Sequence, residues 1–211
     1  MMWIQIATGF TGAWTLWFLV RRAWRKLGWM ASHAVYFSPK GGCEAAIVKE
    51  IKAARREILV QAYSFTADPL TYGLIEAKKR GVHVDIVLDK SNEAERYSDL
   101  RIFLENGLPP LIDPSHAIAH NKIMIIDKHT VITGSFNFTN QAENENAENL
   151  LVIKGHPQLV QLYRSDFHVH KEHARAAEPK VAPAIAPAAK PAPGHQKVPA
   201  IHIDSTPKHA A

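Results

Sequence analysis

The sequence predicts an α/β domain in which helices cover both sides of one mixed β-sheet, with a transmembrane helix before it and a disordered tail after it. Short β-branched segments alternate with helical segments from about residue 31 to residue 173. Residues 1–20 are almost wholly apolar, whereas Pro and Ala dominate residues 174–211. We therefore expect an anchor with a basic flank over 1–30, a folded domain over 31–173 and a disordered tail over 174–211.

The first segment, Met1 to Val20, is long enough to cross a bilayer. Four basic residues follow it at 21–26, whereas a cleavable signal peptide carries its basic residues in front. The positive-inside rule then favours an uncleaved, single-pass anchor in a bacterial inner membrane, with the folded domain in the cytoplasm. The alternative is cleavage near Ser32-His33-Ala34 and export to the periplasm.

Composition excludes some classes of protein. A chain of 211 residues suits one domain with appendages, and its single cysteine, Cys43, excludes an intrachain disulfide and a thiolate metal cluster. The formal net charge is +5, but the excess of basic residues lies at the two ends of the chain. The charge is therefore weak support for nucleic-acid binding by the folded domain.

The expected elements begin with a strand at Ala34–Phe37, broken by Ser38–Gly42. A helix from about Cys43 to Arg56 carries an apolar stripe and exposes its lysines. A strand follows at Ile58–Tyr63.

Asp68-Pro69 is typical of a helix start, and Gly81 ends that helix after Arg80. The remaining expected elements are a strand at Val82–Leu88, a helix from about Asn92 to Glu105, a strand at Leu150–Ile153 and a closing helix at Pro157–His173.

The stretch from His120 to Asn137 predicts a β-hairpin that gathers polar side chains. If Lys128-His129 is a two-residue turn, Ser135 lies opposite Lys122 and Asn137 lies opposite His120, on one face of the sheet. That face would present an imidazole, an ammonium, a hydroxyl and a carboxamide, which together form an anion site with a nucleophile or base. The alternative is a core hairpin whose polar residues lie at its wet end.

These residues resemble a known signature. His120-x-Lys122, four residues, Asp127, six residues and Gly134-Ser135-x-Asn137 are similar to the motif of the phospholipase D superfamily. The likeness extends from about Tyr36 to His173 and is closest to the small, single-motif bacterial nucleases of that family. It is also carried by Tyr63-Ser64-Phe65-Thr66, by Phe138-Thr139 and by Glu148-Asn149.

The resemblance implies a hydrolase that cleaves phosphodiesters through a covalent phosphohistidine, without metal or other cofactor. His120 would be the nucleophile in one protomer and the general acid in the other. The expected catalytic partners are Lys122 and Asn137 on the phosphoryl oxygens, Ser135 as a further donor and Glu148 orienting the imidazole. Asp127 and Gly134 would have supporting, structural roles.

The chain has one such motif, whereas the reaction uses two histidines on opposite sides of phosphorus. A two-fold homodimer would supply the second histidine and would share the active site at its interface. The alternative within the chain is His116.

Three lesser patterns remain open. Tyr63-Ser64-Phe65-Thr66 leaves the end of a strand and could line a substrate groove or form a capping turn. Ser38–Gly42 could offer backbone amides to a phosphate at a helix N-terminus. His168, His170 and His173 resemble a metal cluster, but histidines on a solvated helix end fit the pattern better, so no metal is expected.

Three functions follow from these features. The first is a nuclease acting on DNA or RNA. The second is a phospholipase D that hydrolyses phospholipid headgroup esters, which the anchor and the weakly charged domain favour. The third is an inactive, membrane-tethered scaffold, against which the intact motif counts strongly.

Overall fold

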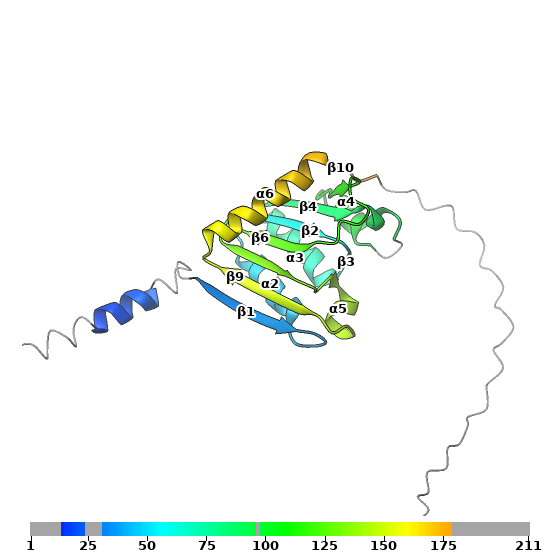
Figure 1. Cartoon of the computed structure of the whole chain (residues 1–211). Helices are drawn as coiled ribbons and strands as arrows, with labels where there is room; N and C mark the ends of the chain where they lie inside the picture. Colours follow the sequence, from blue (N-terminus) through cyan, green and yellow to red (C-terminus); the bar gives the residue numbers. More distant parts are fainter. Residues whose placement is uncertain (1–13, 24–30, 96–97, 179–211) are drawn as a thin grey trace, which may run out of the picture. The chain divides into compact units, whose positions relative to one another are not determined.

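The computed structural model describes residues 14–23, 31–95 and 98–178. From Ser32 onward the chain forms one large mixed sheet with helices on both faces, so the predicted α/β domain is confirmed (Figure 1). The strands of this sheet are β1 Ser32–Phe37, β2 Glu57–Ala62, β4 His83–Asp89, β5 Leu111–Asp113, β6 Lys122–Ile126, β7 Thr130–Gly134, β9 Asn149–Lys154 and β10 Arg175–Ala176.

The strand order is β1-β9-β7-β6-β2-β4-β5-β10, and β2 is where the sheet changes direction. It pairs in parallel with β4 and antiparallel with β6. A separate two-stranded parallel sheet joins β3 Phe65–Thr66 to β8 Phe138–Thr139. The helical elements are α2 Cys43–Ala53, α3 Asp68–Lys79, the 3-10 turn η1 Lys90–Glu93, α4 Leu100–Glu105, α5 Asn140–Asn144 and α6 Pro157–His173.

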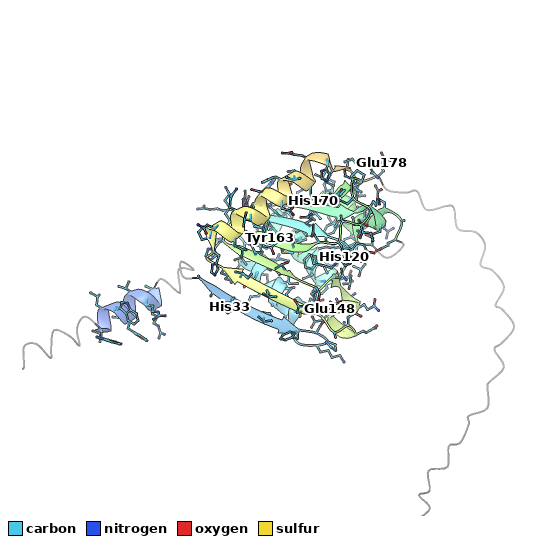
Figure 2. All side chains as sticks on the ribbon, viewed as in Figure 1. His33, His120, Glu148, Tyr163, His170 and Glu178 are labelled. Atoms are coloured by element: carbon cyan, nitrogen blue, oxygen red, sulfur yellow. The ribbon has the colours of Figure 1, made fainter. Side chains whose placement is uncertain are left out.

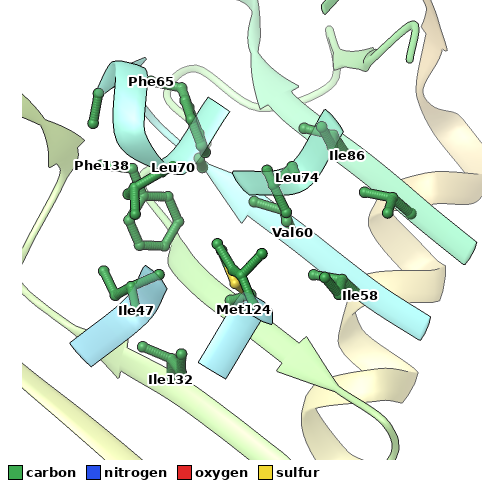
Figure 3. Close-up of a cluster of buried hydrophobic side chains, with 14 of the residues drawn as sticks. Ile47, Ile58, Val60, Phe65, Leu70, Leu74, Ile86, Met124, Ile132 and Phe138 are labelled. Carbon is green, nitrogen blue, oxygen red and sulfur yellow. The ribbon is translucent and has the colours of Figure 1, made fainter. Parts of the chain in front are cut away.

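Two hydrophobic clusters hold the layers together because the central strands are apolar on both faces. Ile58 and Val60 of β2 point into the larger cluster, which α2 and α3 cover (Figure 3). Leu59, between them, points the other way and packs in a smaller cluster with Val160 and Phe167 of α6. Helices therefore cover both faces of β2 and β6, which carry the candidate site at their ends.

The register of the β6–β7 hairpin differs from the prediction. Ile126 pairs with Thr130, so the loop has three residues, and the predicted two-residue turn at Lys128-His129 is wrong. Asp127 and Lys128 both have positive φ, and the His129 amide donates to the Ile126 carbonyl at 3.0 Å. The slip removes Ser135 from its predicted place opposite Lys122.

The predicted helices agree with the structure only in part. The helix predicted at Pro157–His173 is confirmed over its whole length. The helix expected from Asn92 to Glu105 is instead a short 3-10 turn at Lys90–Glu93 and a later helix at Leu100–Glu105. The Asn92 side chain donates to the carbonyls of Tyr63 and Asp89, and these contacts fix the turn.

The expected transmembrane helix over Met1–Val20 is not supported. Residues 14–23 are helical and expose apolar side chains such as Trp14 and Phe18, and residues 1–13 lie outside the described part of the chain. No helix among the described residues is long and apolar enough to cross a bilayer, since a span takes about 20 residues. The predicted anchor, and the single-pass inner-membrane localisation that rested on it, are therefore wrong.

The predicted tail lies almost wholly outside the described residues. The described chain continues past His173, and Arg175 and Ala176 pair antiparallel with β5. The Arg175 guanidinium also donates to the Glu93 carboxylate at 2.6 Å. The compact unit ends at Lys180, and the unit from Val181 to Ala211 is not among the described residues.

Candidate active site

The candidate site lies where β2 ends and β6 begins. These strands are antiparallel neighbours, and Ala62 pairs with Lys122. The Tyr63 amide extends the ladder by donating to the Asn121 carbonyl at 2.8 Å. Tyr63 therefore meets the segment that contains His120 and Lys122. His120 and Glu148 lie at the same end of the sheet (Figure 2).

Lys122 is a buried cation at the centre of this site. Its side chain is only 7% exposed, and its Nζ donates to the His120 carbonyl at 2.8 Å. The same Nζ lies 5.1 Å from the centre of the Tyr63 ring, within the range of a cation–π contact. Burial lowers the pKa of Lys122 from its usual value, and the nearby Glu148 carboxylate offsets part of that decrease.

The His120 ring is exposed and rests against an aromatic side chain. Its centroid lies 4.6 Å from that of Tyr63, with a tilt of 56° between the ring planes. In the described part of the chain the imidazole makes no hydrogen bond, so both ring nitrogens can accept or donate elsewhere. An accessible imidazole beside a buried ammonium can attack an electrophile whose negative charge the ammonium stabilises.

The end of β7 approaches β9 closely, and Gly134 makes this possible. Its φ is +151°, and a Cβ at this position would lie 2.2 Å from the Asn149 carbonyl oxygen. The next residue, Ser135, accepts hydrogen bonds at its Oγ from the Asn149 amide at 3.0 Å and from the Asn149 side chain at 3.2 Å. Ser135 is thus tied to β9, and its hydroxyl proton is not used in these contacts.

Asn137 carries a polar atom without a partner. Its Oδ1 is buried and has no hydrogen bond, while its carbonyl accepts from the Thr139 amide at 2.8 Å. A buried amide group without a partner is costly and is typical of a ligand-binding position. No hydrogen bond joins Asn137 to His120 or Lys122 in the described structure, and the predicted convergence of all four polar groups stays a prediction.

Glu148 has a different set of partners from the one predicted. Its Oε1 accepts from the Asn146 side chain at 3.2 Å, and its amide donates to Ser38 Oγ at 3.2 Å. No hydrogen bond links it to His120 within the described chain. The orienting role expected for Glu148 therefore stays a prediction.

Asp127 anchors the hairpin loop to the start of β2. Its carboxylate accepts from the backbone amides of Arg55, Arg56 and Glu57 at 2.9, 2.7 and 3.0 Å. These bonds link the loop to the α2–β2 connection and place no charge near Lys122.

The Tyr63–Thr66 segment divides between the site and the core. Tyr63 contacts His120 and Lys122, and Ser64 and Thr66 are half-buried. Phe65 is fully buried and packs edge-on against Phe103 and Phe138, so it does not line a groove. Tyr63 is therefore the residue of this segment that contributes its side chain to the candidate site.

The Ser38–Gly42 loop does not form the phosphate cradle that the sequence suggested. The Lys40 amide donates to the Glu143 carbonyl at 2.6 Å. Glu143 Oε2 accepts from the Glu44 amide in the first turn of α2 at 2.9 Å. A carboxylate of the chain itself therefore already caps this helix N-terminus.

His116, the in-chain alternative for the general acid, lies in a different group of residues. Its Nδ1 is 2.9 Å from Asp113 Oδ2, and its ring stacks on that of His170 at 4.7 Å between centroids. Its ring makes no contact with His120 in the described structure. Sequence reasoning missed this grouping because Asp113 and His170 are far apart in the chain.

Comparison with known proteins identifies the family. A family model described as "Cardiolipin synthase, PLD-like domain" matches residues 47–171. The chain belongs to the phospholipase D-like family. The resemblance seen in the sequence is therefore confirmed.

Individual members of the phospholipase D-like family resemble the chain over its folded part. A protein of Rickettsia typhi named phospholipase D is 42% identical over 135 residues, which cover 64% of this chain and 66% of that protein. The crystal structure of Nuc from Salmonella typhimurium, a phospholipase D family member, has a TM-score of 0.67 and 36% identity, and the match covers 70% of this chain and 98% of that one. NucT from Helicobacter pylori has a TM-score of 0.65 at 19% identity over 70% of this chain and 99% of its own, a likeness of fold alone.

Proposed function

We propose that the chain hydrolyses phosphodiesters in DNA or RNA through a covalent phosphohistidine at His120, as a homodimer and without a catalytic metal. The observation that carries this proposal is the exposed His120 imidazole above a buried Lys122 ammonium that is bonded to the His120 backbone. Nucleophile and cation belong to one short segment at the start of β6, so their separation is fixed by the strand itself.

The reaction has two steps in which each histidine exchanges roles. A ring nitrogen of His120 attacks phosphorus, the bond to the leaving oxygen breaks, and His120 of the partner subunit donates the proton that this oxygen needs. Water then attacks phosphorus, the phosphorus–nitrogen bond breaks to release His120, and the same partner histidine, neutral after the first step, accepts the proton of the water. Lys122 offsets charge on the non-bridging oxygens throughout, so no Mg²⁺ is required for that purpose.

Other side chains would complete the pocket. Asn137 would donate from its amide nitrogen to a phosphoryl oxygen, which accepts hydrogen bonds. Ser135 has a hydroxyl proton to donate, because its Oγ acts as acceptor toward Asn149. Tyr63, packed on His120 and Lys122, offers an aromatic face beside the scissile group.

A dimer is needed because the second histidine is missing from the protomer. His116 is held by Asp113 and His170, which supports supplying the acid from a partner subunit. Mixing wild-type protein with inactive His120→Ala protein, under conditions in which subunits exchange, tests this. If each site uses both subunits, activity falls as the square of the wild-type fraction, whereas a linear fall and a monomer mass in sedimentation would exclude the shared site.

The choice of nucleic acid as substrate is supported by the match to Nuc, which extends over 98% of that chain. The alternative, a phospholipid headgroup ester, is supported by the name phospholipase D of the Rickettsia typhi relative at 42% identity. The folded domain itself is not strongly basic. Because the predicted transmembrane anchor is not supported, it gives no reason to prefer a phospholipid substrate.

One assay separates these substrates. The full-length protein, without added Mg²⁺ or Ca²⁺, is offered plasmid DNA, single-stranded RNA and cardiolipin vesicles in parallel, with His120→Ala protein as the control in each arm. We expect cleavage of a nucleic acid that the His120→Ala variant lacks. Turnover of the vesicles alone would move the substrate to phospholipid, and equal activity of the variant would end the proposal.

A further inference from the structure

A second cluster of reactive side chains lies apart from the His120 contacts. It contains Asp113 at the end of β5, His116 in the following loop, and His170 and His173 in the last turn of α6. The figure labels His170 on α6 (Figure 2). The segments therefore come from two distant parts of the chain and meet at the β5 edge of the sheet.

The four side chains converge within a small volume. Each offers one ligand atom, and these atoms all lie within 4.8 Å of one another. Asp113 Oδ2 is 2.7 Å from His170 Nδ1 and 2.9 Å from His116 Nδ1, while Oδ1 is 3.3 Å from His173 Nε2. Asp113 is fully buried and His170 is 9% exposed, whereas His116 and His173 reach solvent.

Hydrogen bonding within the chain does not account for all of these groups. Asp113 Oδ1 already accepts from the Ser115 amide at 2.9 Å, and Oδ2 serves two imidazoles. His173 Nε2 is buried and forms no hydrogen bond, although it points at the same carboxylate. A ring nitrogen without a partner, directed into a group of three other ligand atoms, indicates a missing binding partner.

The charge of the cluster suits a cation. Burial by itself would raise the pKa of Asp113, but the hydrogen bonds from His170, the Ser115 amide and His116 outweigh it, and together with the nearby His173 ring they hold that pKa below its usual range. Asp113 is therefore a carboxylate at neutral pH. Three imidazoles and one carboxylate form a donor set typical of zinc.

We propose that Asp113, His116, His170 and His173 bind one Zn²⁺ that fastens the end of α6 and the loop after β5 to the sheet. Ligand atoms at ~2.0–2.1 Å from a tetrahedral ion lie about 3.3 Å from one another. Asp113 lies 2.7–3.3 Å from the three rings, and the four ligand atoms, which all lie within 4.8 Å of one another, would move toward this value on binding the ion. Four protein ligands leave no open position for a reacting water, so the site is structural.

The ion would stabilise the loop that leads from β5 to His120. The loop from Asp113 to His120 is already held by the Ala119 amide, which donates to the buried Asp89 carboxylate at 2.7 Å. Lys90 Nζ donates to the His116 carbonyl at 2.8 Å. An ion bound to the His116 ring would hold this loop in a third place, in addition to the Ala119 amide and the His116 carbonyl. The proposal does not depend on the chemistry proposed for His120.

Zinc binding is measured on tag-free, full-length protein. The metal is removed by chelation and dialysis, and the protein is then titrated with Zn²⁺ by calorimetry and with Co²⁺ by visible absorption. We expect one ion per chain, the strong absorption of tetrahedral Co²⁺, and a melting temperature that rises by several degrees with Zn²⁺.

The decisive variant is His116→Gln, because this ring is half exposed and its loss leaves the core packing intact. We expect zinc affinity to fall by at least about 100-fold, since removing a direct ligand costs more than removing a group behind one. The matched control is His168→Gln, an exposed histidine on the same helix outside the cluster. Both variants keep His195, His202 and His209, so zinc bound there appears equally in both.

Three results would overturn the proposal. They are the absence of stoichiometric binding by the wild-type protein, equal affinity in the His116→Gln variant, and zinc binding without any rise in melting temperature. Equal losses in the two variants would place the ion elsewhere on the chain.

Discussion

The molecule places histidines in two settings, and the contrast explains their different roles. At the start of β6, His120 is exposed, has no hydrogen bond in the described structure and lies above a buried cation. At the end of β5, His170 is buried and is held by the Asp113 carboxylate at 2.7 Å. The first imidazole is accessible to a substrate, whereas the second is held in place by its surroundings.

The charged groups beneath these histidines also differ in their effect on stability. Lys122 is a buried cation whose pKa is lowered by burial, so holding it charged at neutral pH costs free energy of folding. Asp113 is a buried anion whose partners outweigh its burial, so it supports the fold. The buried charge beside His120 thus lowers the stability of the fold, whereas the buried charge at the end of β5 does not.

The largest expected effect is that of His120→Ala on turnover. We expect a loss of at least about 100-fold, since the variant removes the nucleophile and, in the dimer, the acid. Because the ring is exposed and rests against Tyr63, the melting temperature should stay within error of the wild type. His168→Ala, measured alongside, should keep full activity; a similar loss there would erase the contrast.

Lys122→Met should separate catalysis from stability. We expect turnover to fall by about 100-fold, because the ammonium stabilises charge in the transition state. The melting temperature at neutral pH should be equal to or above that of the wild type, since a buried cation has been replaced by an apolar side chain of similar length.

The same pair of proteins gives a pH test. A Lys whose folded pKa lies below its unfolded value of 10.5 binds fewer protons in the folded state. The wild type should therefore become more stable relative to Lys122→Met, as measured by the difference between their free energies of unfolding, when the pH rises through the folded pKa toward 10.5. A difference that does not change with pH would show that the cation carries no such penalty.

Gly134→Ala should destabilise the end of β7 next to the site. The new Cβ would lie 2.2 Å from the Asn149 carbonyl oxygen, so β7 and β9 must separate, at a cost of about 2–3 kcal/mol. Gly81→Ala is the matched control, because that glycine also has positive φ but nothing lies within 4 Å of the added atom. Its cost should be about 1 kcal/mol. Equal losses in denaturant unfolding would contradict the close contact.

The smallest expected effect is that of Asp127→Asn, at about 1 kcal/mol of unfolding free energy. The amide keeps one acceptor oxygen for the three backbone amides that the carboxylate binds. Glu145→Gln, at an exposed carboxylate, should change stability by less. A loss of turnover in Asp127→Asn as large as that in Lys122→Met would give Asp127 a direct part in the chemistry.

Local patterns were predicted well from the sequence, and long-range pairing was not. The helix at Pro157–His173 was readable because its proline start and apolar stripe are properties of the segment alone. The hairpin register was misjudged because Asp127 and Lys128 adopt positive φ without the Gly or Asn that normally marks such a turn.

The site shows the same division. The motif residues His120 and Lys122 lie two apart on one segment, and their contact follows from that spacing. The packing of Tyr63 on His120 depends on the pairing of β2 with β6. The cluster on Asp113 depends on α6 crossing back over β5, and the sequence shows only its histidines. The anchor was predicted from apolar composition alone, and no helix among the described residues is long and apolar enough to span a bilayer.

The position of β1 has a consequence for synthesis of the protein. Its partner is β9, and Ser32 pairs with Lys154, near the other end of the folded domain. A strand made early by the ribosome therefore waits for nearly the whole domain before β9 pairs with it, and its Val35 and Phe37 side chains stay exposed even in the folded structure. The nascent chain should therefore be most prone to aggregation until β9 emerges, and chaperones that bind extended apolar segments would act in that interval.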